Sequence, residues 1–470
     1  MSHSSAVTVE TPVDAPPVRP QSATWLGHPR GMYLVAFAEL WERFSYWGLV
    51  GLLVIFLTAS PSNGGWGWDN ARALQLYGWY AGLAFALPAL GAWVANSVIS
   101  ERRCIAIGGI VILCGHVLLA MSPSMAHWYS GGEGPNAAGT AIFLVGLALV
   151  LLGTGLLKPA ISSIVAGLYP ESGARRDEGF TWFFTAIYIG AAFGAIVVGY
   201  LGERIGWHYG FGAAAIGMAL GMLAYLTKQN AWLGDIGAAA PIKRQHSARP
   251  LTRVDWERIG VIGVQGLFTI IYAAAFYQMF GMLALYSRDR LDRFIGGFEV
   301  PVTWLQTVNL WSFFLCVPLL SAAWRKLSRQ HRNPSASYKL SFGIGSLAIG
   351  YLVLVAAESG SGPDLPSVLW LIGAYVLFGL GDSLVWANQI SLTSKLAPLR
   401  YRPLLVGGWY ICIGIGTWLT SYIGMLAEHY SFRTVFIQLA CGCAIAALLL
   451  ALLTPLQQRF MHGAEDTGHE

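Results

Sequence analysis

The chain has 470 residues, of which 55% are hydrophobic and only 11% are charged. A soluble globular protein carries about 25% charged residues, so this composition excludes a water-soluble domain. Apolar runs of about 18 residues or more recur along the chain, and the shorter alternating segments of a membrane β-barrel are absent. The net charge of +5 is small for this length and does not indicate a particular partner.

Twelve apolar runs divide the chain, and each is long enough to cross a bilayer as a helix. A longer polar stretch after the sixth run separates two groups of six. Two six-helix halves related by an axis along the membrane normal form the major facilitator fold, so we expect an all-α membrane protein of that fold. The predicted spans are residues 31–58, 72–99, 103–122, 139–166, 176–201, 206–227, 255–286, 302–326, 336–357, 366–392, 402–428 and 432–455.

The loops between these spans differ in their content of basic residues. Seventeen Lys and Arg residues fall in or beside one set of loops, against six in the other set. Basic loops stay in the cytoplasm, so we assign the first set and both termini to that side. The same rule accounts for the basic loops without nucleic-acid binding.

The predicted organisation has five parts. Residues 1–24 are rich in Ser, Thr and Pro and lack the apolar core of a signal peptide, so we expect a disordered cytoplasmic tail. Residues 25–227 and 255–456 are the two six-helix halves, residues 228–254 are a cytoplasmic linker, and residues 457–470 are a second cytoplasmic tail. In this design the substrate binds between the halves near the membrane midplane.

The first span contains three charged side chains, Glu39, Glu42 and Arg43, in an otherwise apolar run. Glu39 lies about 12 Å inside the start of this helix. A charge at such depth costs about 2.5–3.5 kcal/mol on insertion scales. Spacings of three and four residues place all three groups on one helical face. We therefore expect this face to point towards a charged partner or water between the halves, and away from lipid.

Two further charges lie deep in later spans, Lys158 in the fourth and Asp382 in the tenth. The fourth span runs towards the cytoplasm, so Lys158 is at a depth similar to that of Glu39 and can pair with it. Cations at Arg43 and Lys158 opposite an anion at Asp382 suit a zwitterion. Carboxyl groups beside exchangeable cations also suit proton coupling, because moving a cation changes their proton affinity. The alternative is a permanent ion-pair network that only holds helices together.

Two motifs resemble those of the proton-dependent oligopeptide transporters of the major facilitator superfamily. The first is Glu-Leu-Trp-Glu-Arg-Phe followed by Ser-Tyr-Trp-Gly in residues 39–48, and the second is Gly-Thr-Gly-Leu-Leu-Lys-Pro in residues 153–159. The resemblance implies a multi-pass transporter of the bacterial plasma (inner) membrane. It also implies that the partners are protons, a small peptide or peptide-like molecule, and the lipid bilayer.

The resemblance implies roles for individual residues as well. Proton coupling falls on Glu39, Glu42, Arg43 and Lys158. Asp382, with a shorter side chain, matches a tenth-helix glutamate that binds the peptide ammonium. The predicted substrate-binding set is Arg43, Tyr46, Trp47, Phe85, Lys158, Tyr188, Asn309, Asp382 and Trp409.

Several positions depart from the family pattern. Trp47 replaces the second tyrosine of the first motif, Phe85 replaces a pocket tyrosine of the second helix, and Tyr188 replaces an asparagine of the fifth. Val50 and Tyr277 stand where the family has an arginine and a glutamate of an external gate. The joint loss of both partners leaves no charge stranded. We therefore expect a pocket that has kept its charges and become more aromatic.

These observations predict a proton-coupled symporter that imports small peptides or peptide-like zwitterions by alternating access. The alternatives are a proton-coupled exporter of drugs or metabolites, which the aromatic positions favour, and a non-transporting sensor with the same fold. The sequence shows no nucleophile–base constellation and no phosphate-binding loop, so we expect neither an enzyme nor an ATP-driven pump. His116 and His127 lack Cys, Asp or Glu neighbours at ligand spacing, and no metal or other cofactor is predicted.

Overall fold

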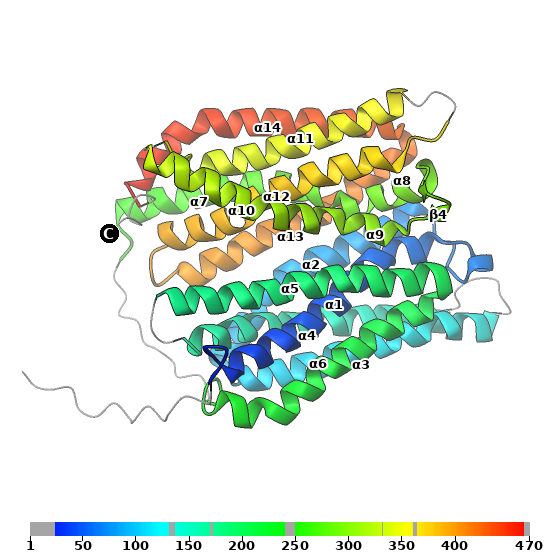
Figure 1. Cartoon of the computed structure of the whole chain (residues 1–470), viewed down its shortest axis with the longest axis horizontal. Coiled ribbons are helices and arrows are strands. Elements are labelled where there is room, and N and C mark those ends of the chain that lie inside the picture. Colours follow the sequence, from blue (N-terminus) through cyan, green and yellow to red (C-terminus); the bar gives the residue numbers. More distant parts are fainter. Residues whose placement is uncertain are drawn as a thin grey trace, which may run out of the picture.

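The computed structural model describes residues 24–130, 137–169, 173–239, 250–330, 332–360 and 364–464. Within these ranges, twelve helical segments are long and apolar enough to cross a membrane. They lie close to the twelve predicted spans and confirm an all-helical multi-pass architecture (Figure 1). Residues 1–23, 240–249 and 465–470, which include most of the predicted N-terminal tail and parts of the predicted linker and C-terminal tail, lie outside the described ranges.

Fourteen α-helices in the described ranges make these twelve spans, because the seventh and eighth spans are interrupted. The seventh span consists of α7 (Arg253–Phe276), the 3-10 turn η3 (Tyr277–Phe280) and α8 (Met282–Arg290), and the eighth consists of α9 (Val302–Gln306) and α10 (Val308–Arg329). The other helices are α1 (Arg30–Thr58), α2 (Asn70–Ser97), α3 (Glu101–Ser130), α4 (Ala137–Gly167), α5 (Ala174–Tyr200), α6 (Trp207–Leu233), α11 (Ala336–Gly360), α12 (Val368–Leu396), α13 (Arg402–His429) and α14 (Phe432–Met461).

Several helix ends lie beyond the predicted spans, and those of α6 and α14 reach into the predicted linker and C-terminal tail. Helix α6 continues to Leu233 and α14 continues to Met461, so the stretches assigned to the linker and the C-terminal tail each begin with helical residues. The added turn of α6 contains Lys228, Gln229 and Asn230, whose polar side chains ended the apolar run without ending the helix. Long polar side chains are good helix formers, which explains why hydropathy underestimates the length of the helix.

The helices pack as two groups. Helix α1 packs against α5 and α6, and α3 packs against α4 and α6; in the second group α11 packs against α12 and α14, and α13 packs against α7. Figure 1 shows the first group below the second, with α2 and α13 side by side where the groups meet. The start of α1 and the end of α14 lie at one end of the bundle.

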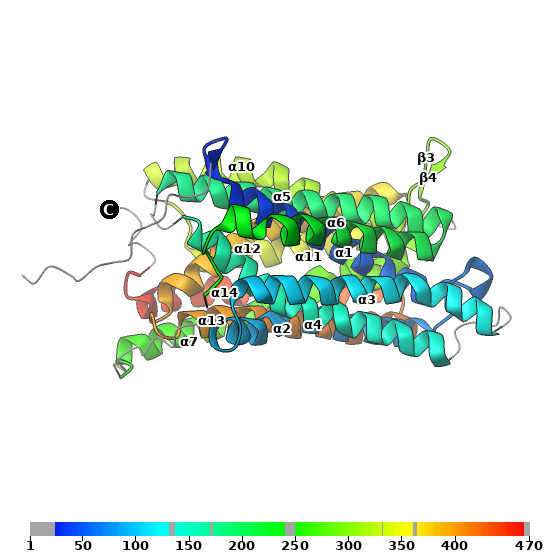
Figure 2. The same cartoon turned by 90° about the horizontal axis from the view of Figure 1, so that it is seen from below.

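The opposite end of the bundle carries a β-hairpin between α8 and α9. Strands β3 (Phe294–Ile295) and β4 (Phe298–Glu299) pair antiparallel. Gly296 and Gly297 between them have φ values of 60° and 84°, which glycine adopts without strain in a two-residue hairpin turn. Figure 2 shows this hairpin projecting beyond the helices. A second two-stranded hairpin, β1 (Thr24–Trp25) with β2 (His28–Pro29), precedes α1.

Helix α1 is the most enclosed span, with 83% of its most apolar window buried, against 17% for the eighth span. Two glycines of α5 let that helix approach it very closely. A Cβ added to Gly190 would lie 2.1 Å from the carbonyl oxygen of Leu40, and one added to Gly194 would lie 2.1 Å from that of Phe44. These contacts place α5 against the side of α1 that carries Leu40 and Phe44.

Candidate functional site

Helix α1 brings three charged side chains together in the interior. Glu39, Glu42 and Arg43 are 2%, 0% and 5% exposed, so all three point into the protein. The Arg43 guanidinium donates two hydrogen bonds to the carboxylate of Glu42, through Nε and Nη2. Its Nε also lies 3.6 Å from Oε1 of Glu39, one turn earlier. The predicted common face is therefore present, and its charges are paired inside the protein.

Helix α4 adds the fourth charge of the set. Nζ of Lys158 lies 3.3 Å from Oε1 of Glu39, as the matching depths of the two residues predicted. Thr154, one turn earlier in α4, donates a hydrogen bond of 3.4 Å to Oε1 of Glu42. The Lys158 side chain is 31% exposed while that of Glu39 is 3% exposed. Lys158 is thus the member of the set that is most accessible from outside it.

The four residues balance one another. Glu39 lies between the two cations, Arg43 joins both glutamates, and Lys158 reaches Glu39 alone. With both carboxylates ionised, the set carries no net charge. Removing Glu39 leaves Lys158 without its ion-pair partner, and removing Arg43 leaves Glu42 without one, which is costly in a low-dielectric interior.

Asp382 stands apart from this set, in the second group of helices. It lies in α12 and is 5% exposed. Its Oδ1 accepts a hydrogen bond of 2.8 Å from the hydroxyl of Tyr272 in α7, and Tyr272 is itself completely buried. The ion pairs described for this structure do not include Asp382. Trp386 also donates a hydrogen bond to this carboxyl group, and both donors are neutral, in contrast to the charged partners of the glutamates of α1.

Aromatic contacts join the two groups of helices around these charges. Trp47 of α1 lies 5.0 Å from Phe280 of η3, measured between ring centroids. Phe85 of α2 lies 5.2 Å from Tyr277, which stands where the family has the glutamate of an external gate. Each of these two rings from the first group therefore meets a ring of η3, where the seventh span is interrupted.

Tyr188 of α5 makes a third contact of this kind. Its ring stacks on Phe313 of α10 at 4.7 Å with an interplanar angle of 25°, and lies edge-on to Phe314 at 5.1 Å. Trp47, Phe85 and Tyr188, which all depart from the family pattern, therefore share one property: each ring contacts a ring of the other group of helices.

The remaining predicted pocket residues occupy different surroundings. Tyr46 lies beneath Arg43, whose Cζ is 4.7 Å from its ring centroid, and is 4% exposed. Asn309 is 3% exposed, and its Oδ1 has no hydrogen-bond partner in the structure. Trp409 is 3% exposed and lies edge-on to Trp386 at 5.1 Å. Asn309 therefore keeps a free acceptor, while Trp409 is packed against another aromatic ring.

Sequence reasoning missed three residues of the site. Tyr272 is the hydrogen-bond partner of Asp382, and Thr154 bonds Glu42 although it was quoted only as part of a motif. His116 of α3 is completely buried, neither of its ring nitrogens has a hydrogen-bond partner, and it interacts electrostatically with Glu42. A buried polar residue in an apolar helix was the signal available for His116; Tyr272 gave none, because tyrosine is ordinary in such helices.

The fold and the buried charges define a membrane transporter built on the major facilitator fold. A family model described as PTR2, POT family, matches residues 102–233 and 255–443 of the chain. The uncharacterized transporter YclF of Bacillus subtilis is 28% identical, covering 93% of this chain and 96% of that protein. The peptide transporter YePEPT of Yersinia enterocolitica is also 28% identical, covering 95% and 98%.

A solved structure agrees with the sequence relatives. The crystal structure of a peptide transporter, POT, in complex with alafosfalin superposes with a TM-score of 0.85 at 25% identity, covering 94% of this chain and 97% of that one. The chain therefore belongs to the POT family of proton-dependent oligopeptide transporters. It is a multi-pass membrane transporter and not an enzyme.

Proposed function

We propose that the protein is a proton-coupled symporter that imports small peptides or peptide-like zwitterions across the bacterial plasma membrane by alternating access. The observation that carries this proposal is the contrast between the neutral four-residue set in α1 and α4 and the lone carboxylate of Asp382. The similarity to a peptide transporter from Yersinia and to a POT structure with alafosfalin supports the substrate class.

The neutral set supplies a physical reason for proton coupling. A substrate carboxylate gains little from four charges that already cancel. One proton on Glu39 or Glu42 leaves the set with a charge of +1, and Lys158 is then free to meet the substrate because it has the most exposed side chain of the four. Proton and substrate carboxylate therefore bind best together, which is the requirement for symport.

Asp382 supplies the complementary end of the site. Its carboxyl group accepts hydrogen bonds from the neutral side chains of Tyr272 and Trp386. A substrate ammonium would provide a counter-charge for the ionised form that the described ion pairs do not supply. The aromatic contacts of Trp47, Phe85 and Tyr188 lie between the groups of helices, where they would bound a small substrate between its two charged ends.

The orientation follows from the basic loops. We assign both termini and the central linker to the cytoplasm, because seventeen of the loop and flanking Lys and Arg residues lie on that side. The two six-helix halves would then rock about the substrate and expose it to each side in turn. Each charge moved inwards gains about 2.3 kcal/mol per 100 mV of membrane potential.

Uptake by purified protein in proteoliposomes tests this proposal. Labelled di- and tripeptides should accumulate when the outside is acidic or the inside is negative, and an uncoupler should abolish accumulation. Unchanged accumulation with the uncoupler present would rule out proton drive. Absence of binding by any di- or tripeptide would rule out the peptide class.

Export by proton antiport is the second candidate, and the aromatic contacts of Phe85 and Tyr188 favour it. Everted vesicles distinguish it from import. Accumulation of hydrophobic cations in such vesicles, driven by the proton gradient and not matched by any peptide, would favour the exporter.

A further inference from the structure

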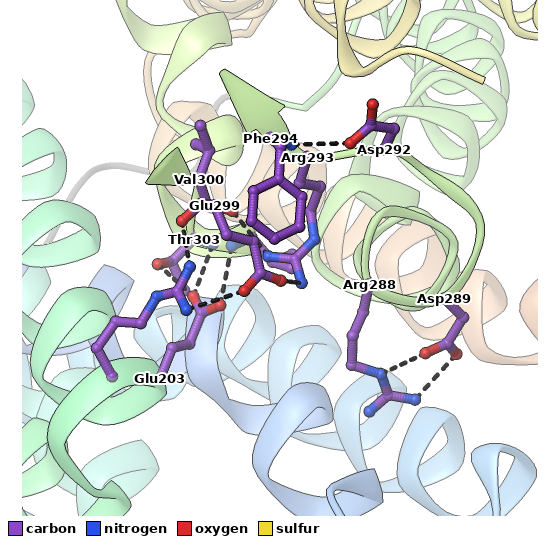
Figure 3. A network of polar contacts seen from close by, with 11 residues as sticks. Glu203, Arg288, Asp289, Asp292, Arg293, Phe294, Glu299, Val300 and Thr303 are labelled. Atoms are coloured by element: carbon purple, nitrogen blue, oxygen red, sulfur yellow. Dashed lines mark hydrogen bonds and ion pairs between the residues drawn. The ribbon is translucent and has the colours of Figure 1, made fainter. Parts of the chain in front are cut away.

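A group of polar contacts joins the two halves at the end of the bundle where α1 and α5 finish (Figure 3). The carboxylate of Glu203 accepts three hydrogen bonds from the start of the eighth span. The donors are the backbone N–H of Val302 at 2.9 Å, the backbone N–H of Thr303 at 3.0 Å and the hydroxyl of Thr303 at 2.7 Å. One side chain of the first half therefore satisfies three donors of the second.

The local backbone explains how Glu203 reaches this position. It lies in η2 (Leu201–Ile205), a π-helical turn that continues α5. A π turn inserts an extra residue into the helical repeat and so re-aims the following side chains, and such turns are frequent at functional positions. Glu203 is part-buried in these hydrogen bonds, so its charge is separated from much of the water outside.

Neighbouring charged residues form ion pairs at the same contact. Nη1 of Arg204 lies 2.9 Å from Oε2 of Glu299, at the base of the β3–β4 hairpin. Arg293 pairs with the same carboxylate and donates a 2.7 Å hydrogen bond to the carbonyl of Val300. The Arg204 and Glu299 side chains are 30% and 29% exposed, so water screens this pair and it contributes less than the hydrogen bonds to Glu203.

Glycine contacts show that the surfaces meet without spare room. A Cβ added to Gly199 of α5 would lie 1.9 Å from Oγ1 of Thr303. A Cβ added to Gly51 of α1 would lie 2.8 Å from Oε1 of Gln306. Both helices of the first half thus touch α9 closely, and they cannot separate from it gradually while keeping the hydrogen bonds to Glu203.

We propose that Glu203, held by Val302 and Thr303, is the latch that keeps the external side of the transporter closed. The proposal rests on the alternating-access function proposed above, in which this end of the bundle faces outwards. Opening to the outside separates η2 from α9 and removes all three donors from the carboxylate at once. The latch therefore adds a defined barrier to opening, and it does so without an arginine at Val50 or a glutamate at Tyr277.

Distance measurements on the full chain test the latch separately from transport. Spin labels at Ser62, beyond α1, and Asp364, before α12, report the separation of the halves at this end; both residues are exposed. The six native cysteines are first replaced and peptide uptake is checked. Glu203→Gln and Glu203→Ala should raise the ratio of outward-open to outward-closed molecules about tenfold or more, as expected for loss of hydrogen bonds to a charged group.

Two variants make the test specific. Gly199→Ala retains the carboxylate but forces α5 away from Thr303, so it should shift the distances in the same direction even if the Glu203 variants fold poorly. Asp289→Asn removes a carboxylate at the same end that bonds its own neighbour Arg288 in α8, and it should leave the distances unchanged. Distances like those of the unsubstituted chain in the Glu203 variants and in Gly199→Ala would overturn the latch.

The two proposals fail in different ways. If the distances shift in the Glu203 variants but no peptide is transported by the unsubstituted protein, the latch stands and the substrate assignment falls. If peptides are transported and the distances do not shift, the latch falls and the proposed function stands.

Discussion

The two halves of the molecule treat their buried charges in opposite ways. In the first half, Glu39, Glu42, Arg43 and Lys158 form a set in which every charge has a partner. In the second half, Asp382 has a hydrogen bond from a neutral tyrosine and no described ion pair. Both regions are deeply buried, so burial alone does not distinguish them. The difference is whether the protein supplies the counter-charge.

This difference separates two tasks. A balanced set can take up a proton and rearrange its pairs while each remaining charge keeps some compensation, so it suits reversible protonation. An isolated carboxylate has no such freedom and is best stabilised by a cation that arrives from outside. Under the proposed function, energy coupling belongs to the first half and recognition of the substrate ammonium to the second, and the following predictions test that division.

Glu42→Gln should have the largest effect. The substitution replaces one of the two carboxylate oxygens that accept from Arg43 with an amide donor, and it removes the nearer counter-charge of a buried guanidinium, which costs about 3–5 kcal/mol. We expect gradient-driven uptake to fall at least about a hundredfold, equivalent to about 2.7 kcal/mol, with a lower melting temperature. Glu178→Gln, at a side chain that is 64% exposed, is the matched control and should change neither quantity. Normal pH dependence of uptake in Glu42→Gln would contradict its role.

Lys158→Gln should uncouple transport with less damage to the fold. The side chain is 31% exposed, and Glu39 retains Arg43 at 3.6 Å, so no charge is left wholly unpaired. We expect uphill uptake to fall about thirtyfold, or about 2 kcal/mol, while exchange of labelled for unlabelled substrate continues. Lys158→Arg keeps the charge and should retain more of the uptake. Uphill accumulation at the normal level in Lys158→Gln would show that the lysine is only structural.

Asp382→Asn should weaken binding without removing proton dependence. Loss of a charged partner for the substrate ammonium is worth about 1.5–3 kcal/mol, so we expect the Kd to rise about ten- to hundredfold. An N-acetylated peptide, which has no ammonium, provides the control because its affinity should be the same in both proteins. If the two peptides lose affinity equally, Asp382 does not recognise the ammonium. Binding by isothermal titration measures both.

Tyr272→Phe should have the smallest effect of the four. It deletes one hydroxyl that donates to Oδ1 of Asp382 and leaves the buried ring in place. A neutral hydrogen bond contributes about 1 kcal/mol, so we expect about a fivefold rise in Kd with normal proton dependence. Tyr351→Phe, which loses a hydrogen bond to the carbonyl of Ala275 elsewhere in the same half, is the control for a general loss of stability. A change in proton dependence caused by Tyr272→Phe would break the division between the halves.

Much of the fold could be predicted because each helix that crosses the lipid needs an apolar run of about 20 residues. Apolar runs of the right length identified all twelve spans found in the described residues, and the pair between Glu39 and Lys158 followed from depth along two helices. The breaks at Gly281 and Thr307, which interrupt the seventh and eighth spans, were not predicted. A short irregular turn changes hydropathy too little to appear in a run of about twenty residues.

The contacts that depend on three-dimensional approach could not be predicted. Tyr272 and Asp382 are 110 positions apart, and no local spacing relates them. Glu203 and Thr303 are 100 positions apart, and Glu203 looked like an ordinary charge at a span end. The roles assigned by resemblance to the pocket residues stay predictions, although the structure places Trp47, Phe85 and Tyr188 in contacts between the halves.

The close approach of α5 to α1 at Gly190 and Gly194 has a mechanical consequence. Backbone contacts at these two glycines leave no soft layer of side chains in which one helix could slip against the other. If protonation of Glu39 or Glu42 displaces α1, as the proposed function requires, α5 is expected to move with it. Helix α5 ends in the π turn that carries Glu203, so this movement would act directly on the proposed latch at the external face.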